Sequence, residues 1–228
     1  RRYRLRSPGD PLRRFRRETQ NLFNLQHPNI VRLYGLEQDD LLAFMLMDYV
    51  EGTTLRAEIL RLKGKTMPSE RIREVMQPIC AALHYAHRQK IVHCDVKPAN
   101  VMIDKNGHIL LADFGIARMA EGATTMTMVG AGTPAYMAPE QVRDENPSPQ
   151  TDIYALGIML YEMLTGGERP FTGEQARITG TTSEKVRWEH MNLTPPSPRK
   201  FNRKIPAHIE SVVMKCLEKE PSKRFADA

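Results

Sequence analysis

Cysteine is scarce in this chain of 228 residues, and Cys80, Cys94 and Cys216 lie far apart. The absence of C-x-x-C spacing argues against a zinc site and a disulfide framework, and it fits a reducing compartment. Long apolar runs are also missing, since none reaches the roughly 18 residues that a membrane span needs. The Arg-rich start lacks the apolar core of a secretory signal. We therefore expect a cytoplasmic domain with no membrane segment within this chain, while the parent protein could carry an anchor elsewhere.

The charge of the chain is concentrated at its beginning. The formal net charge is +6, and eight arginines stand among the first 17 residues: Arg1, Arg2, Arg4, Arg6, Arg13, Arg14, Arg16 and Arg17. One interpretation is a basic arm for nucleic acid. No aromatic stacking platform or groove-binding motif accompanies these arginines. We therefore favour a solvated helix face and expect no nucleic-acid partner.

Hydrophobic periodicity predicts a short part with strands, followed by a longer and mainly helical part. The early part combines one stretch of helical spacing with two strand-like runs, at 12–25, 30–35 and 41–47. The later part contains three stretches of helical spacing, which begin at Ser69, after Ser148 and near Pro206. The first of these is expected to end at about Arg88 and the second at Gly166-Gly167.

A hairpin and a hinge complete this organisation. Asn106-Gly107 lies between strand-like runs at 101–104 and 108–112, and Asn-Gly supplies the positive φ angles of a tight turn. The stretch 51–54 is the expected hinge between two lobes, and ligands favour clefts between such units. The fold class is thus α+β, with a small lobe over residues 1–50 and a large helical lobe over 51–228.

The strongest chemical signal is a set of polar residues in two short motifs. Residues 93–100 read HCDVKPAN, and Asp-Phe-Gly follows at 113–115. Phosphoryl transfer needs an acidic residue to accept the hydroxyl proton, a cation near the moving phosphoryl group, and oxygen ligands for Mg²⁺. Asp95 could accept the proton, and Lys97 is the cation. Asn100 and Asp113 could supply the oxygen ligands for Mg²⁺. Each alone would be a common loop residue, but the four together in this register indicate a phosphotransferase.

These motifs, together with GTPAYMAPE at 132–140, resemble the catalytic loop, magnesium loop and activation-segment end of eukaryotic-type Ser/Thr protein kinases. The motifs KPAN at 97–100 and PFTGE at 170–174 most resemble those of the bacterial branch. The resemblance implies a two-lobed kinase fold, the cofactors ATP and Mg²⁺, and a protein substrate phosphorylated on Ser or Thr.

The resemblance also assigns residues to the nucleotide site. Glu18 matches the glutamate that pairs with the ATP-anchoring lysine, and Met47 matches the gatekeeper beside adenine. Asp48 and Val50 would offer backbone carbonyl and N–H groups to adenine, and Met102 would form the floor under the ring.

Further matches concern the protein substrate and the support of the loop. In Ser/Thr kinases, a threonine hydroxyl bridges the catalytic aspartate and the lysine of the catalytic loop. Thr133 and Lys97 resemble this threonine and this lysine. Asp152 resembles the aspartate that holds the catalytic loop by backbone hydrogen bonds. Glu140 and Arg224 resemble a buried ion pair that pins the activation segment to the helical lobe.

Two parts of the family pattern are not found. No Gly-rich phosphate loop precedes residue 18, and no strand lysine is present, unless Arg1 or Arg2 takes its place. The simplest interpretation is a domain cut at both ends, with residues 1–228 alone catalytically silent. Two rival interpretations are a pseudokinase scaffold that docks partners through the helical lobe and a small-molecule phosphotransferase.

Cys94 is a third departure, because most such kinases have Arg at this position. That arginine pairs with a phosphate on the activation segment and orders it. Thr124, Thr125 and Thr127 are possible phosphorylation sites here, with Arg118 as a partial substitute partner. We expect the activity to depend only weakly on their phosphorylation.

Overall fold

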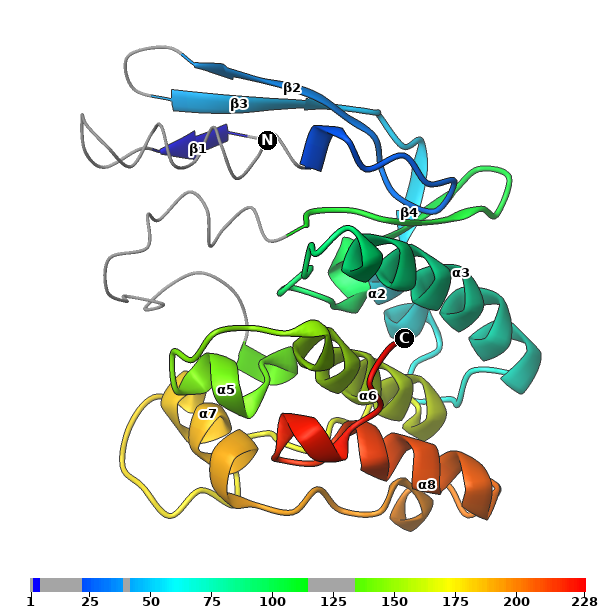
Figure 1. Cartoon of the computed structure of the whole chain (residues 1–228). Helices are drawn as coiled ribbons and strands as arrows, with labels where there is room; N and C mark the ends of the chain where they lie inside the picture. The colour runs from blue at the N-terminus through cyan, green and yellow to red at the C-terminus, as the bar shows by residue number, and fades with distance from the viewer. Residues whose placement is uncertain (1, 5–21, 39–41, 115–133) are drawn as a thin grey trace.

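The structure is a computed structural model that describes residues 2–4, 22–38, 42–114 and 134–228 (Figure 1). Its strands are β1 (Arg2–Arg4), β2 (Leu33–Gln38), β3 (Leu42–Met47), β4 (Gly52–Thr54), β5 (Val101–Asp104) and β6 (Ile109–Leu111). Its helices are α2 (Leu55–Arg61), α3 (Ser69–Arg88), α5 (Pro139–Val142), α6 (Pro149–Thr165), α7 (Thr182–Asn192) and α8 (Ala207–Cys216). The first sheet lies at the top of the view and the helices lie below it, as expected for the α+β class. In the described part of the chain, no helix has the length and apolarity that crossing a membrane requires.

The first sheet has the antiparallel order β1-β3-β2. The prediction of a strand at 30–35 is wrong at its start, which lies three residues too early, because β2 begins at Leu33. Ile30 instead forms an isolated bridge to Leu111, and the Val31 N–H donates to the Leu111 carbonyl at 3.0 Å. This segment therefore ties the first sheet to the second one, which has the order β4-β5-β6.

The expected hinge at 51–54 contributes a strand, since β4 pairs with β5. Gly52 is required there, because a Cβ atom would lie 2.0 Å from the Ile103 carbonyl oxygen. The predicted hairpin between β5 and β6 is present, but only Gly107 of its Asn-Gly pair has a positive φ, 86°. The Asp104 carboxylate accepts from the N–H groups of Asn106 and His108 at 2.8 Å, which stabilises a longer turn than predicted.

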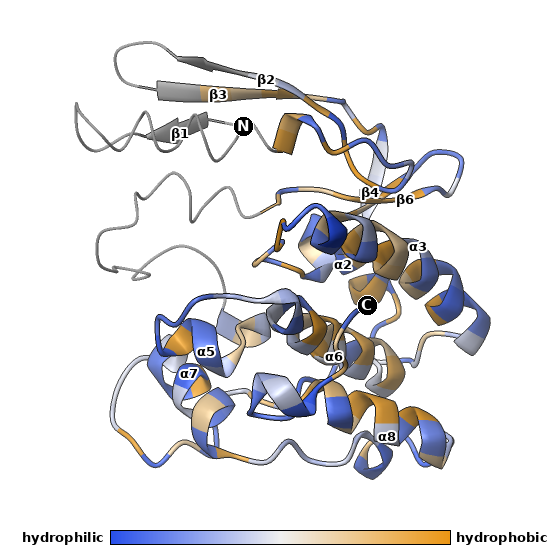
Figure 2. Cartoon of the chain, in the orientation of Figure 1, coloured by the Kyte–Doolittle hydropathy of each residue, from blue (hydrophilic) through white to orange (hydrophobic). Residues whose placement is uncertain are grey.

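The long helices follow their sequence signals. The prediction for α3 is confirmed from Ser69 to Arg88, and α6 begins after Ser148 and ends at Gly166, which has a φ of 81°. Most residues of α6 are buried, so it is the central helix of the large lobe rather than a one-sided surface helix. Apolar residues run along α6 and α8 (Figure 2). Gly157 permits their close packing, since a Cβ atom would lie 2.6 Å from that of Cys216.

Three shorter helices were not predicted: α2, α5 and α7. Thr54 caps α2, because its hydroxyl accepts from the Ala57 N–H at 3.2 Å. Thr181 and Glu184 form a capping box at the start of α7, which is a signal that the sequence does contain. Of the helix predicted at 12–25, only residues 22–25 are described: 22–23 are helical, 24 is a turn and 25 is irregular, so the helix ends about two residues earlier than predicted.

Candidate active site

Asp95, Lys97 and Asn100 meet in the loop between α3 and β5. The Lys97 ammonium contacts both Asp95 carboxylate oxygens, at 2.8 and 2.6 Å. The Asn100 side-chain amide donates to Asp95 Oδ2 at 2.9 Å and to the Asp95 backbone carbonyl at 2.8 Å. The Asp95 side chain is 41% exposed, so its carboxylate is held by neighbours and still accessible to a substrate.

Asp152, on the first turn of α6, holds the backbone of this loop. It is 1% exposed, and its two oxygens accept from the N–H groups of His93 and Cys94, each at 2.8 Å. The ring nitrogen Nε2 of His87 lies 2.8 Å from the same carboxylate. A buried carboxylate is tolerated only with such partners. The loop that carries Asp95 is thus anchored to the central helix.

His93 links the loop to the segment that follows β6. Its Nδ1 accepts from the Asp95 N–H at 3.2 Å, so the proton lies on Nε2, which donates to the Ala112 carbonyl at 3.0 Å. Burial lowers the pKa of His93 below its usual value, which fits this neutral form. The ring centroids of His93 and Phe114 are 4.4 Å apart. The loop that carries Asp95 is therefore packed against the Asp-Phe-Gly segment.

Asn100 and Asp113 lie at the same end of the β5–β6 hairpin. The Ala112 N–H donates to the Asn100 carbonyl at 2.9 Å, and Asp113 is the next residue. Asp113 adopts a positive φ of 63°, which is uncommon for a residue with a side chain. Carboxylate and amide oxygens are ligands that suit Mg²⁺, which usually keeps water and substrate phosphates as its other ligands. These residues fit the predicted ion.

The residues assigned to adenine lie at the end of β3 and in the second sheet. Met47, Val50 and Met102 are half-buried. The Asp48 N–H donates to the Arg32 carbonyl at 3.0 Å, so the Asp48 carbonyl is the group left to meet a ligand. Glu18, which the sequence pattern pairs with a lysine, lies outside the described residues.

Glu140 and Arg224 form a two-bonded ion pair. The Arg224 guanidinium donates to both Glu140 oxygens, at 2.7 and 2.8 Å, and the two side chains are at most 3% exposed. Burial alone would raise the pKa of Glu140, but hydrogen bonds from Arg224 and Thr151 hold it below its usual value. Thr133, Thr124, Thr125, Thr127 and Arg118 lie outside the described residues.

Sequence reasoning missed a second buried carboxylate cluster near the activation-segment end. The Tyr136 hydroxyl donates to one oxygen of Glu162, and Arg56 donates to the other at 2.8 Å. Glu162 is fully buried in α6, and burial raises its pKa in spite of these bonds. The three residues come from separate elements, so no local pattern indicates that they meet.

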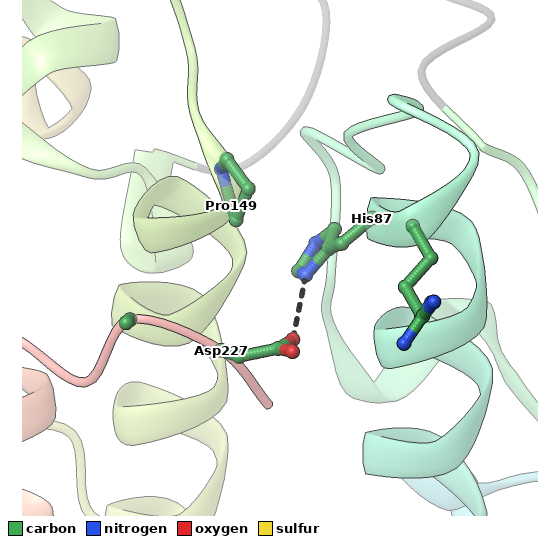
Figure 3. A pocket seen from close by; sticks show the side chains of 5 residues that line it. His87, Pro149 and Asp227 are labelled. Atoms are coloured by element: carbon green, nitrogen blue, oxygen red, sulfur yellow. Dashed lines mark ion pairs between the residues drawn. The ribbon is translucent and has the colours of Figure 1, made fainter.

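A pocket of about 330 Å³ lies beside His87 (Figure 3). Its lining residues are His87, Arg88, Pro149, Ala226 and Asp227. The Nδ1 of His87 faces Asp227 at 3.5 Å, while the Nδ1 of His84 lies 2.5 Å from the other oxygen of Asp227. The described residues contain no group of three His, Cys, Asp or Glu side chains that could hold a metal.

Comparison with known proteins places these motifs in a family. The model of the protein kinase domain matches residues 4–227. Serine/threonine-protein kinase PrkC of Bacillus subtilis is 39% identical over 219 residues, which cover 95% of this chain and 32% of PrkC. Serine/threonine-protein kinase PknB of Mycolicibacterium smegmatis is 38% identical over 222 residues, covering 94% of this chain and 34% of PknB. The chain thus spans about a third of the length of these relatives.

Solved structures agree with the family model. The PknI kinase domain of Mycobacterium tuberculosis superposes with a TM-score of 0.73 at 28% identity, over 95% of this chain and 74% of that one. Rad53 residues 1–466 in complex with AMP-PNP give a TM-score of 0.72 at 29% identity, over 92% of this chain and 51% of that one. The chain therefore belongs to the protein kinase domain family.

Proposed function

We propose that the protein transfers the γ-phosphoryl group of ATP to Ser or Thr hydroxyls of other proteins. The observation that carries this proposal is the contact of Asp95 with Lys97 and Asn100 in a loop anchored by Asp152. The arrangement brings a carboxylate, a cation and a side-chain amide into contact, with the carboxylate 41% exposed, which suits the needs of phosphoryl transfer.

Each residue of this cluster has a distinct task. Asp95 orients the acceptor hydroxyl and takes its proton while the new bond from oxygen to the γ-phosphorus forms and the bond to the β-phosphate oxygen breaks. Lys97 offsets the negative charge that gathers on the transferred group. The Lys97 contacts of 2.8 and 2.6 Å also keep the Asp95 carboxylate in place before the substrate arrives.

Asn100 and Asp113 are the proposed Mg²⁺ ligands. When bound, Mg²⁺ neutralises charge on the β- and γ-phosphates and orients them. The Asn100 amide nitrogen is turned toward Asp95, so its side-chain oxygen is the atom that can serve as a ligand. The backbone bond from Ala112 to Asn100 keeps Asp113 at the same end of the hairpin.

We propose that the boundary between the two lobes lies between residues 50 and 51. The nucleotide base is assigned to the proposed cleft between these lobes. Met47 and Met102 would contact the adenine ring, with the Asp48 carbonyl and Val50 N–H as its hydrogen-bond partners. Glu18 keeps its proposed role as the partner of an ATP-anchoring lysine. We assign the domain to the cytoplasm, where cysteines such as Cys80, Cys94 and Cys216 stay reduced and form no disulfide.

The substrate class rests on Lys97 and Thr133, whose combination is typical of Ser/Thr kinases. Glu140 and Arg224 would support the platform that receives a protein substrate. Ala99 stands where kinases that prefer basic substrates often carry Glu. Ala99 thus removes one reason to expect a substrate preference for arginine, and the proposed acceptor is a protein Ser or Thr.

The test is a phosphotransfer assay of the full-length protein with ATP and Mg²⁺, offering a generic protein and an aminoglycoside side by side. We expect phosphate on Ser or Thr of the protein, none on the aminoglycoside, and loss of transfer in Asp95→Ala with ATP binding retained. Binding of partners without any transfer would instead support the pseudokinase scaffold. The expectation that residues 1–228 alone are silent stays a prediction.

A further inference from the structure

The peptide unit between Cys94 and Asp95 is held at both of its polar ends by side chains. Its N–H, which belongs to Asp95, donates to His93 Nδ1 at 3.2 Å. Its carbonyl, which belongs to Cys94, accepts from Gln141 Nε2 at 2.8 Å. Rotation of this peptide unit would move the Asp95 carboxylate, so its two partners fix the direction of that carboxylate.

This fixation is needed because the backbone at Cys94 is strained. Cys94 has a φ of 65°, in the left-handed region that residues with a Cβ atom seldom adopt. Such conformations persist only where the surroundings over-determine them. Asp152 holds the N–H of Cys94 and Gln141 holds its carbonyl, so the strained residue is bonded on either side.

Gln141 comes from α5, directly after the Ala138-Pro139-Glu140 motif, and its amide bonds in two directions. Its Oε1 accepts from the Ala138 N–H at 3.0 Å, while its Nε2 donates to the Cys94 carbonyl. An N–H needs an acceptor and a carbonyl needs a donor, so the two partners fix the orientation of the amide. The side chain therefore connects the activation-segment end to the catalytic loop.

We propose that Gln141 is a positioning residue that sets the direction of the Asp95 carboxylate through the Cys94 carbonyl. This inference rests on the proposed function and deepens it, because it makes the position of the base depend on α5. Movement of α5 would be transmitted to Asp95 through a single hydrogen bond. A displacement of about 1 Å is enough to cost an enzyme about a hundredfold in rate.

A purely structural role for Gln141 is the alternative, in which it only caps α5 at Ala138. Gln141→Glu separates the two roles, since its carboxylate can still accept from Ala138 but cannot donate to Cys94. We expect kcat to fall at least about tenfold, with the KM for ATP and the melting temperature little changed. A wild-type kcat in Gln141→Glu would overturn the proposal.

A second pair keeps the test valid if Gln141→Glu does not fold. Gln141→Lys and Gln141→Met both lose the acceptor for Ala138, but only Lys can donate to the Cys94 carbonyl. We expect Lys to retain clearly more activity than Met, and equal kcat values would contradict the proposal. The matched control is Gln150→Glu, which removes an amide-to-carbonyl bond of 3.3 Å to Ala226 at an exposed site.

A readout independent of catalysis separates this inference from the proposed function. Loss of the Gln141 bond should speed amide hydrogen exchange at residues 93–96 in Gln141→Glu and Gln141→Met, but less so in Gln141→Lys. If the wild-type protein transfers no phosphate, the proposed function fails while the exchange pattern still decides the role of Gln141. Unchanged exchange in all three variants would overturn the inference.

Discussion

The two lobes are stabilised by different kinds of burial. Before residue 51, the buried side chains that the structure describes are all apolar: Leu22, Leu25, Ile30, Val31, Leu33 and Met45. The helical lobe also buries polar and charged side chains, among them His93, Asn100, Glu140, Asp152, Glu162 and Arg224. Apolar contacts tolerate small shifts, whereas hydrogen bonds are directional. The described buried polar contacts thus lie in the helical lobe, where some of them hold the loop around Asp95.

The largest expected effect comes from breaking the buried ion pair of the helical lobe. Arg224→Met leaves the Glu140 carboxylate buried and unpaired, and we expect a loss of about 3–5 kcal/mol in the free energy of unfolding. The control is Arg143→Met, which removes an exposed pair with Glu145 and should cost less than about 1 kcal/mol. Equal, small losses in chemical denaturation would show that burial of the pair contributes little.

The dependence of stability on pH should differ between the lobes. Because the pKa of Glu140 is lowered in the folded state, the unfolded chain binds a proton at higher pH than the folded chain. The contribution of the pair is therefore present above the ordinary pKa of glutamate and lost as the pH falls through the folded value.

The measurement compares the cost of two substitutions at decreasing pH. The cost of Glu140→Gln should shrink as the pH falls, because the wild-type carboxylate becomes protonated too. Met45→Ala, in the first sheet, should cost about 2–5 kcal/mol at every pH, since it only leaves a cavity. A pH-independent cost at Glu140 would contradict the proposed contrast.

A tyrosine–carboxylate hydrogen bond occurs in each lobe, which allows a matched comparison. Tyr136 bonds to the buried Glu162, and Tyr34, which is 58% exposed, bonds to Asp48 at 2.6 Å. Tyr136→Phe should cost about 1–3 kcal/mol, because a buried acceptor loses a partner. Tyr34→Phe should change stability by less than about 0.5 kcal/mol. Similar melting temperatures for both variants would remove the distinction.

The smallest effect is expected from residues that lie outside the described part. Replacing Thr124, Thr125 and Thr127 by Ala should lower the activity of the full-length protein less than tenfold, because Cys94 cannot pair with a phosphate. The same triple change in a Cys94→Arg background should cause a larger loss. A hundredfold loss in the native background, about 2.7 kcal/mol, would mean that phosphorylation acts without that arginine.

Much of the fold could be predicted where local signals are strong. The helices α3 and α6 have long periodic patterns, and Ser148 and Gly166 mark the ends of α6. The predicted start of β2 was three residues too early, because Ile30 and Val31 are as apolar as the residues of β2. These two residues bond to Leu111 instead. Periodicity reports burial and not the hydrogen-bond partner, so it could not place this boundary.

The contacts of the candidate site also divide into those that a local motif predicts and those that it does not. Asp95, Lys97 and Asn100 lie within six residues, and their motif was enough to predict that they lie together. The Tyr136–Glu162 bond and the bond from Gln141 to the Cys94 carbonyl join segments far apart in the chain. Neither has a local spacing that indicates it, because the first depends on how the segment of Tyr136 lies against α6 and the second on how α5 lies against the loop of Cys94.

Asp95 is the proposed catalytic base, and the residues at the end of β3 are the proposed nucleotide contacts. The most direct test is single-turnover phosphotransfer by the full-length protein at increasing ATP concentrations. Asp95→Asn should abolish the rate at saturating ATP while leaving the ATP dissociation constant within about twofold, and Met47→Trp should mainly raise that constant. An Asp95→Asn protein that retains a tenth or more of the wild-type rate would contradict the account.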